Sequence, residues 1–515
     1  MKISRRNFLK TAATGIGSVT LAGLGTVEAG ATQFDQVKKW DYEADVVVLG
    51  IGGAGLMTAI TARDQGADVL ILEKASEAHA GGNTRVSGQG YWCPSDFNKS
   101  VEYQNAMSDG YPIPDDITEV FHKHSIHVTE WLTEMGADMR TIPTQGEYPE
   151  FPGGAGYVCW STLGNGYQRL WLLLMENALK RNIRVQYEMP AKELIRDVKT
   201  GEVRGVVAEN KGKKVYVKAK KAVALCTGGF ENNQEMIRDY LGMPCGYPKG
   251  SPYNTGDGIR MAMAIGADLW HMHNQAGPDF NFRIPGKDWA FGYSFSPKGN
   301  GWIWVAKDAA RFTNEAYFTK HGKIPFHGIY IHVPTPLPVH CVFDETMRKS
   351  GPLYPPEYFF CWWYEIEKYK WSPDSSAEIE KGWIVKADTL KELAAKIGKD
   401  PDMLEKTVST WNRSCAEGND SEFGRDAKRM APIQTPPFYA AEFVPAFTNT
   451  QGGPRRNSKA QVMDINRKPI PRLYSAGELG SIYSYHYQGG GNVLECIVFG
   501  RIAGEHAAAE KPWSS

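Results

Sequence analysis

The stretch Asp45-Val-Val-Val-Leu-Gly-Ile-Gly-Gly-Ala-Gly-Leu56 decides the fold of this chain. Its aliphatic run predicts a buried strand, and the residues from Leu56 to Gln65 predict a helix. Between strand and helix, Gly50, Gly52 and Gly55 stand at G-x-G-x-x-G spacing. Such glycines allow a sharp turn, a close approach of the backbone to a pyrophosphate, and tight packing of the helix on the strand, in that order.

A second aliphatic strand, Asp68 to Leu72, follows the helix and ends at Glu73. An acidic residue about 20 positions beyond such glycines is the usual partner of a ribose hydroxyl. Strand, glycines, helix, strand and acid together predict a dinucleotide-binding βαβ unit in an α/β, Rossmann-like domain. A βαβ turn with a purely structural role is the alternative.

The composition is that of an ordinary soluble globular protein. Its 515 residues are enough for about two or three domains. With 58 basic and 58 acidic residues, the chain has no net charge, which gives no support for nucleic acid or an anionic membrane surface as a partner. None of the eight cysteines lies in a C-x-x-C pair, so no haem, zinc or iron–sulfur spacing is visible. We therefore expect no metal site and interpret the cysteines as buried thiols, with a disulfide left open.

Residues 1–31 have the pattern of an export signal. Arg5 and Arg6 form a twin-arginine (Tat) pair, a weakly apolar run follows, and Ala29-Gly30-Ala31 is typical of a cleavage site. The pattern predicts a periplasmic or otherwise extracytoplasmic protein whose mature chain starts near Thr32. No other run reaches about 18 apolar residues, so we expect no integral membrane span.

The mature chain divides into three segments. Residues 40–277 carry the βαβ unit, and glycine-rich turns return in residues 436–512, at Gly477-Glu478 and at Gly490-Gly-Asn492. Residues 278–435 are instead dense in aromatic residues and proline. We therefore predict a nucleotide-binding domain in two parts, interrupted by an inserted α+β domain. The aromatic residues suit either a pocket for a flat apolar molecule or an ordinary core.

Two helical stretches lie outside the βαβ unit. Residues 114–135 predict one helix that carries His122, His124 and His127. Positions 122 and 124 do not share a helix face, which argues against a metal site, and we interpret these histidines as solvated. Residues 389–415 predict one or two further helices.

Eight sequence blocks resemble, in order, the flavoprotein family of soluble fumarate reductases, succinate dehydrogenase flavoprotein subunits and 3-oxosteroid dehydrogenases. The resemblance covers nearly the whole mature chain. It implies FAD along the first domain, a mobile capping domain formed by the inserted segment, and catalysis where this cap meets the isoalloxazine ring. The blocks are Gly50–Gly55, Glu73, Gly81–Thr84, Thr227–Phe230, Thr255–Gly258, Arg311–Glu315, Ala476–Glu478 and Gly490–Asn492.

The resemblance also implies which residues bind FAD. Respiratory members attach it to a histidine in the loop that corresponds to Gly82–Thr84; Asn83 stands there, so we expect non-covalent FAD. The helix from Val493 resembles one that points its N-terminus at the flavin and stabilises the reduced ring. Asp257 can be a cofactor contact or a helix cap. The expected cofactor residues are Gly50, Gly52, Gly53, Ala54, Gly55, Glu73, Lys74, Gly82, Asn83, Thr84, Gly88, Thr227, Gly228, Gly229, Asp257, Gly477, Glu478, Asn492 and Val493.

The chain departs from the fumarate reductases at their dicarboxylate clamp. The two clamp histidines correspond to Gly277 and Asn449, the proton-delivering arginine to a position near Thr319, and the second arginine to Gln488. An unpaired carboxylate in a closed apolar site costs several kcal/mol. The loss of these cations predicts a neutral or weakly polar substrate rather than fumarate.

The residues that replace the clamp are similar to those of the steroid dehydrogenases. Tyr487-Gln-Gly-Gly-Gly491 matches the segment in which a tyrosine hydroxyl and a glycine N–H hold a keto oxygen, which implies that role for Tyr487 and Gly491. Tyr317 is the expected proton donor or base, with Tyr485 and His486 as further candidates. For each of these side chains a packing role is the alternative.

These observations predict an exported, FAD-dependent enzyme that acts on CH–CH groups. It would reduce an activated C=C bond next to a carbonyl in a neutral, flat, apolar or aromatic molecule. A c-type cytochrome or a quinol-linked protein would be its external electron donor or acceptor. Two alternatives stay open. One is a 3-oxosteroid-like or cyclic-ketone dehydrogenase that runs in the oxidative direction. The other is a flavin subunit that passes electrons without catalysis.

Overall fold

The computed structural model describes residues 31–88, 90–142, 146–155, 157–162, 169–287, 290–291, 295–316, 320–354 and 369–513. The predicted export signal up to residue 30 and the expected proton donor Tyr317 lie outside these residues, as does Thr319. From Ala31 onward the chain forms a single unit.

The predicted strands of the βαβ unit lie in the parallel part of a mixed sheet. Its neighbouring strands, in order, are β24, β10, β2, β3 and β7. A bulge between Ala219 and Ala222 divides β10, so that its first half pairs antiparallel with β9 and its second half parallel with β24. The strands of this sheet are β1 (Thr32–Gln33), β2 (Tyr42–Leu49), β3 (Val69–Leu72), β7 (Arg184–Gln186), β8 (Ala191–Arg196), β9 (Val203–Asn210), β10 (Lys213–Leu225), β23 (Gln461–Met463) and β24 (Pro469–Ser475).

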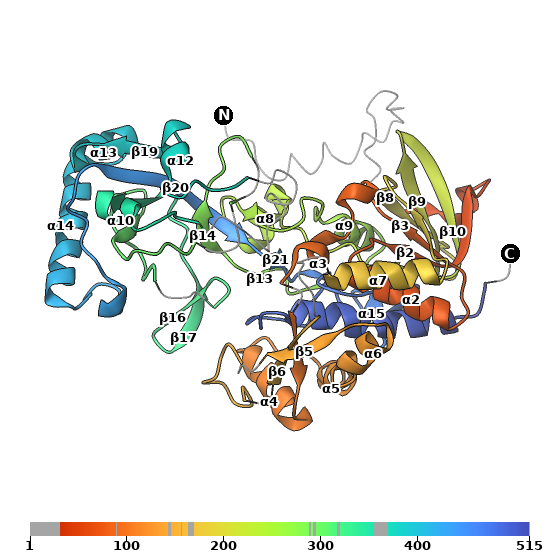
Figure 1. Ribbon diagram of the computed structural model, residues 1–515. Coiled ribbons are helices and arrows are strands. Elements are labelled where there is room, and N and C mark those ends of the chain that lie inside the picture. The colour runs from red at the N-terminus through yellow and green to blue at the C-terminus, as the bar shows by residue number, and fades with distance from the viewer. Residues whose placement is uncertain are drawn as a thin grey trace, which may run out of the picture. The chain divides into compact units, whose positions relative to one another are not determined.

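Both faces of this sheet are covered, as the α/β prediction requires. Val46 and Val48 face one core, whereas Val47 and Leu49 face another, because successive side chains of a strand point to opposite sides. The first core is covered by α2, α7 and α15, which lie alongside one another (Figure 1). The helices around this sheet are α2 (Gly53–Asp64), α3 (Gly82–Val86), α7 (Arg169–Lys180), α8 (Gln234–Leu241), α9 (Asp257–Ala264) and α15 (Gly491–Ala509).

A smaller α+β segment between residues 90 and 162 corrects two predictions. The single helix expected over 114–135 is two helices, because the chain tightens into a turn where the His127 N–H donates to the His124 carbonyl at 3.1 Å. His122 is fully buried beside Phe121 rather than solvated, and burial lowers its pKa to about 3. The elements are β4 (Gly90–Pro94), α4 (Phe97–Met107), α5 (Asp115–Ser125), α6 (Val128–Glu134), β5 (Met139–Ile142) and β6 (Tyr157–Thr162).

The aromatic-rich segment forms a second sheet around the long strand β20 (Phe438–Phe447). Strand β20 follows residues 278–435, and its partner β11 precedes them, whereas the other strands lie within them, so the flanking segments help to build this sheet. Aromatic side chains fill its core, as where Phe282 meets Trp371 edge to face at 5.3 Å. The other strands are β11 (Tyr247–Pro248), β14 (Asp279–Phe282), β15 (Trp302–Val305), β18 (Val339–Asp344) and β19 (Ile384–Ala387), and the helices are α10 (Glu345–Lys349), α12 (Ser376–Glu380), α13 (Leu390–Lys396) and α14 (Pro401–Glu417).

Short ladders join these parts. The pair β12 (Leu269–Trp270) and β22 (Gly453–Pro454) and the pair β13 (Gln275–Ala276) and β21 (Asn449–Thr450) are antiparallel. The hairpin of β16 (Lys323–Phe326) and β17 (Ile329–His332) follows the stretch that contains Tyr317. Within the described residues, no helix is long and apolar enough to cross a membrane.

The family block Arg311–Glu315 is a buried ion-pair cluster. The Arg311 guanidinium donates to Glu315 Oε1 at 2.7 Å and to both carboxylate oxygens of Asp420, at 2.9 and 3.0 Å. Burial opposes the charge, but these two carboxylates outweigh it and raise the pKa of Arg311. The cluster anchors the segment that leads toward residue 317, and thus has a structural role in this chain.

Candidate active site

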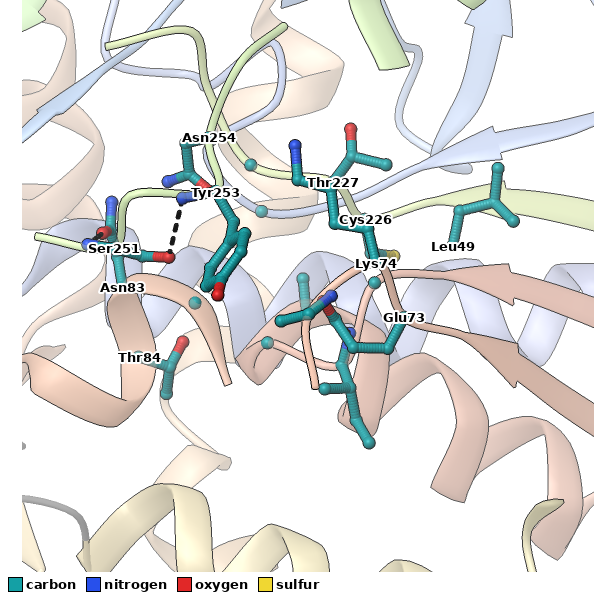
Figure 2. A pocket seen from close by; sticks show the side chains of 18 of the residues that line it. Leu49, Glu73, Lys74, Asn83, Thr84, Cys226, Thr227, Ser251, Tyr253 and Asn254 are labelled. Carbon is teal, nitrogen blue, oxygen red and sulfur yellow. Dashed lines mark hydrogen bonds between the residues drawn. The ribbon is translucent and has the colours of Figure 1, made fainter. Parts of the chain in front are cut away.

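A first cavity opens at the carboxyl ends of β2, β3 and β10, where doubly wound folds bind their ligands. It holds about 830 Å³ of empty space, part of it open to solvent. Figure 2 shows the Tyr253 ring projecting into it, with Asn83 and Asn254 on one side and Glu73 on the other. Tyr253, Asn254, Ser251 and His79 line this cavity but were not expected from the sequence.

The three fingerprint glycines have the geometry that their spacing predicts. Gly50 has a φ of +99°, and a Cβ there would lie 2.4 Å from the Cys226 carbonyl oxygen. A Cβ on Gly55 would lie 1.9 Å from the Gly50 oxygen, so this glycine serves helix packing and does not line the cavity. Gly52 is different, because its Cβ would meet no atom closer than the Gly81 oxygen at 3.7 Å. Gly52 thus leaves open space on the cavity side.

Glu73 fastens the glycine turn. It accepts the N–H of Ile51 at 3.0 Å and that of Ala75 at 2.7 Å, and burial raises its pKa. Beside it, Lys74 Nζ donates to Asp257 Oδ2 at 2.7 Å. Burial would raise the pKa of Asp257, but Lys74 outweighs it and holds this pKa below its usual range. Asp257 is therefore an ion-pair partner at the cavity rather than a helix cap.

Glu478, which lines this cavity, lies beside a second buried glutamate, Glu231. Asn254 Nδ2 donates to Glu231 at 2.6 Å and to Glu478 at 3.0 Å, and Asn83 Nδ2 donates to the same two side chains at 2.9 and 3.1 Å. Burial raises the pKa of both glutamates, and the neighbouring Glu231 raises that of Glu478 further. Such a pair favours a state in which the two share one proton.

A second cavity continues from the first through Asn83, Thr84, Glu478 and Cys496, which line both. It holds about 1200 Å³ of empty space, again partly open. Helix α15 begins at its wall, with Gly490 as the N-cap at a φ of +79° and no side-chain cap. A helix start of this kind presents backbone N–H groups and partial positive charge to a ligand.

The side chains of the second cavity include Tyr487, as expected, and three polar groups that the sequence did not reveal. His321 Nε2 lies 2.8 Å from Glu147 Oε2, and Lys249 Nζ lies 2.8 Å from Asp279 Oδ2. Burial alone would raise the pKa of Glu147, but His321 outweighs it and holds this pKa below its usual range. The expectation that the site has lost its basic residues is thus incomplete, because Lys249 and His321 reach it from other positions.

Tyr487 and Gly491 differ in the hydrogen bonds that they already make. The Tyr487 ring packs edge to face against His321 at 4.8 Å, and its hydroxyl oxygen accepts the Asn492 N–H at 3.4 Å. The Gly491 N–H donates to the Gln488 carbonyl at 2.8 Å. Gly491 therefore reaches a ligand only if that turn bond opens.

The structure gathers most of the expected site residues around these two cavities. Gly55, Gly229 and Gly491 do not line either, and Tyr317 lies outside the described residues. The first cavity is lined by Gly50, Gly52, Gly53, Ala54, Glu73, Lys74, Gly82, Asn83, Thr84, Thr227, Gly228, Asp257, Gly477 and Glu478. The second is lined by Asn83, Thr84, Gly88, Glu478, Tyr487, Asn492 and Val493.

The residues around the cavities fit FAD. Open space at Gly52 and the start of α2 suit a pyrophosphate, and Glu73 stands where a ribose is bound. The start of α15 suits the electron-rich end of a flavin. Fold and site together define a flavin-dependent oxidoreductase with a Rossmann-like domain.

The chain belongs to the FAD binding domain family, which it matches over residues 45–494, and FAD is its cofactor. A fumarate reductase (cytochrome) of Shewanella frigidimarina is 30% identical, over 90% of this chain and 77% of that protein. A digoxin reductase of Eggerthella lenta is 28% identical, over 99% of this chain and 98% of that protein. The predicted family is thereby confirmed, and the chain is an FAD-dependent oxidoreductase that acts on CH–CH bonds.

The same fold is seen in the crystal structure of a 3-ketosteroid Δ1-dehydrogenase from Sterolibacterium denitrificans. It covers 91% of this chain and 99% of that chain, with a TM-score of 0.73 at 23% identity. The two chains therefore share their overall fold.

Proposed function

We propose that this enzyme reduces an activated C=C bond next to a carbonyl in a neutral, flat, apolar or aromatic substrate, with FAD held non-covalently. FAD supplies hydride transfer when it is bound. The digoxin reductase that resembles the chain over nearly its full length supports a bulky substrate. The second cavity, with Val86, Trp92 and Val493 in its walls, supports an apolar one.

The pairing of the charged groups in the second cavity carries this proposal. Lys249 is neutralised by Asp279 and 3% exposed. The pair of His321 and Glu147 is net neutral when the imidazole is charged and net negative when it is not. Among the described residues that line this cavity, no cation is left over for a dicarboxylate, whose burial without partners would cost several kcal/mol.

Tyr487 is the group we assign to the carbonyl oxygen. A phenol can accept one hydrogen bond and donate another at the same time, so its contact with Asn492 is compatible with donation to a substrate. Gly491 would join it when its bond to the Gln488 carbonyl opens. The family resemblance alone supports Tyr317 as a proton donor, and no contact of the described residues adds to it.

The location and the redox partner are part of the proposal. The twin arginines Arg5 and Arg6 support export by the Tat route to an extracytoplasmic site. The chain shows no C-x-x-C haem motif, so its electrons would come from a separate carrier. The cytochrome in the name of the Shewanella relative supports a c-type cytochrome or a quinol-linked protein in that role.

The test compares substrates on purified holoenzyme reduced by a viologen without oxygen. Viologen oxidation is followed with cyclohex-2-enone, a 3-oxo-4-ene steroid, acrylate and fumarate at equal concentrations. We expect the neutral enones to be reduced fastest. Faster turnover of fumarate than of every enone would refute the proposal. In the reverse assay, reduction of an oxidised dye by saturated ketones, without any turnover of enones, would assign the oxidative direction.

A pair of variants tests the assigned donor. Tyr487→Phe should lower kcat/KM for an enone by about 10²–10³, the cost of removing one oxyanion donor. Tyr483→Phe is the matched control, because Tyr483 is also buried, packs against Tyr487 at 5.2 Å and does not line either cavity. Full activity of Tyr487→Phe would remove Tyr487 from the mechanism.

A further inference from the structure

We propose that His321 is an acid–base residue of the second cavity, that Glu147 is its positioning residue, and that this pair moves the proton of the carbon–carbon reaction. The inference rests on the proposed function, since it concerns the same site. His321 and Glu147 both line the cavity, and the His321 ring packs against Tyr487 at 4.8 Å. The imidazole is therefore in contact with the side chain that is assigned to the carbonyl oxygen.

Glu147 is fixed from two sides. Its Oε2 accepts from His321 Nε2 at 2.8 Å and from the Gly489 N–H at 2.7 Å, and its own N–H donates to Gln488 Oε1 at 3.0 Å. The Tyr103 hydroxyl donates to the same Gln488 oxygen at 2.7 Å. A carboxylate held in this way orients an imidazole through one nitrogen and stabilises its charged form, which leaves Nδ1 as the nitrogen that Glu147 does not bind.

The backbone of His321 is held in an unusual conformation. Its φ is +50°, a region that non-glycine residues rarely adopt. The strained position is fastened to Gly277, whose N–H donates to the His321 carbonyl at 3.0 Å. Gly277 is the position at which the fumarate reductases have a clamp histidine. An imidazole thus returns to this neighbourhood from another segment, supplied by a strained residue of the kind that clusters at active sites.

The groups around His321 leave Glu147 as its dominant electrostatic partner. Lys249, which also lines the cavity, is paired with Asp279 at 2.8 Å. Lys320, which precedes His321 in the chain, pairs with Glu150. Lys323 donates to Asn274 at 3.0 Å. The titratable groups that line the cavity with His321 are Glu147, Lys249, Glu478, Tyr487 and Cys496.

The β-carbon of the enone receives a hydride, whose two electrons originate in the external donor and whose proton originates in solvent; bound FAD would supply the hydride-transfer chemistry. The α-carbon receives the proton of the His321 imidazolium, and the C=C bond becomes a C–C single bond. The neutral imidazole then takes up a proton from water. In the oxidative direction the neutral imidazole removes the same proton.

Anaerobic stopped-flow measurements test the pair between about pH 5 and 9. Reduced holoenzyme is mixed with cyclohex-2-enone, and the return of the oxidised flavin absorbance is recorded. We expect the wild-type rate to fall at high pH as the imidazolium is lost. His321→Gln should lower the rate by about 10²–10⁴ and abolish this limb. Glu147→Gln should keep the low-pH rate and move the limb to lower pH, since it removes an opposite charge within hydrogen-bond distance.

A control and a second readout keep the outcome decisive. His327→Gln replaces an exposed histidine that also has a left-handed backbone, with a φ of 47°, and should change nothing. In ¹³C-labelled protein, the imidazole resonance that disappears in His321→Gln should titrate at lower pH in Glu147→Gln. Flavin content shows that each variant is folded, and Glu147→Gln carries the test if His321→Gln loses its flavin.

Two failures are distinguishable. Wild-type protein that reacts with no enone overturns the proposed function and this inference with it. Wild-type protein that reacts, together with an unchanged high-pH limb in His321→Gln or in Glu147→Gln, overturns the inference alone. A limb that disappears in Tyr317→Phe and persists in His321→Gln does the same and assigns the proton to Tyr317.

Discussion

Two of the fingerprint glycines should respond to alanine in opposite ways. In Gly50→Ala the new Cβ would lie 2.4 Å from the Cys226 carbonyl oxygen, at a φ of +99°. The left-handed backbone costs about 1–2 kcal/mol and the overpacking about 1–3 kcal/mol, so we expect the apoprotein to lose about 2–5 kcal/mol. In Gly52→Ala the φ of −70° suits alanine, and the Cβ meets no protein atom within 3.7 Å. That apoprotein should be unchanged or about 0.4–1 kcal/mol more stable.

Although Gly52→Ala should leave the apoprotein stable, it should weaken FAD binding. The space that its Cβ would enter is the space assigned to the pyrophosphate, so we expect the affinity to fall by about tenfold or more, a loss of about 1.4 kcal/mol. Gly66→Ala is the matched control for backbone strain, because Gly66 has a φ of +83° and no atom within 4 Å of its Cβ. It should cost about 1–2 kcal/mol and leave FAD affinity unchanged.

The assay separates stability from binding. Urea unfolding of the flavin-free protein gives the free energy of unfolding, and quenching of FAD fluorescence on titration gives the affinity. Wild-type FAD affinity in Gly52→Ala would refute the placement of the pyrophosphate at this glycine. Equal loss of apoprotein stability in Gly52→Ala and Gly50→Ala would show that both glycines have only structural roles.

Three further changes test the buried polar groups and the helix packing. Arg311→Met removes the cation that Asp420 binds and leaves Glu315 with Arg425 at 3.5 Å, and it should cost about 3–5 kcal/mol in urea unfolding. Glu231 and Glu478 have raised pKa values, so the folded state binds their protons more tightly and the free energy of unfolding should fall as the pH rises above about 4.5. Glu231→Gln should flatten this fall between about pH 5 and 8, as thermal unfolding would show. Gly504→Val should cost about 1–3 kcal/mol, because its Cβ would lie 2.5 Å from a backbone oxygen of α2, and circular dichroism would detect the lower melting temperature.

The parts of the fold that sequence predicted are those whose determinants are local. The turn at Gly50 and the strand before it need only the spacing of a few neighbouring residues, so the βαβ unit and its position at a cofactor cavity followed from the sequence. The prediction that His122 is solvated was wrong, because periodicity places a residue on a helix face without showing what covers that face. In the folded chain the helix α15 packs against α5, and the ring of the preceding residue, Phe121, meets His122 edge to face.

The substrate side of the site could be predicted only in part. Comparison with the family located the positions where cations are lost, and Asn449 does line the second cavity. It could not locate the cations that arrive from elsewhere, because Lys249 and His321 belong to segments that only tertiary packing brings to the same wall. No spacing rule relates two residues whose contact depends on how two sheets are joined.

Lys249 and His321 add basic groups to the second cavity without making it selective for an anion. A site selects against an anion by its net charge and by the partners it leaves for that anion, not by the number of basic residues in its walls. Lys249 is 2.8 Å from Asp279 and His321 is 2.8 Å from Glu147, so each positive group already has its counter-ion. A dicarboxylate entering the cavity would have to displace a carboxylate of the protein, whereas a neutral carbonyl would need only a hydrogen-bond donor, which Tyr487 can provide.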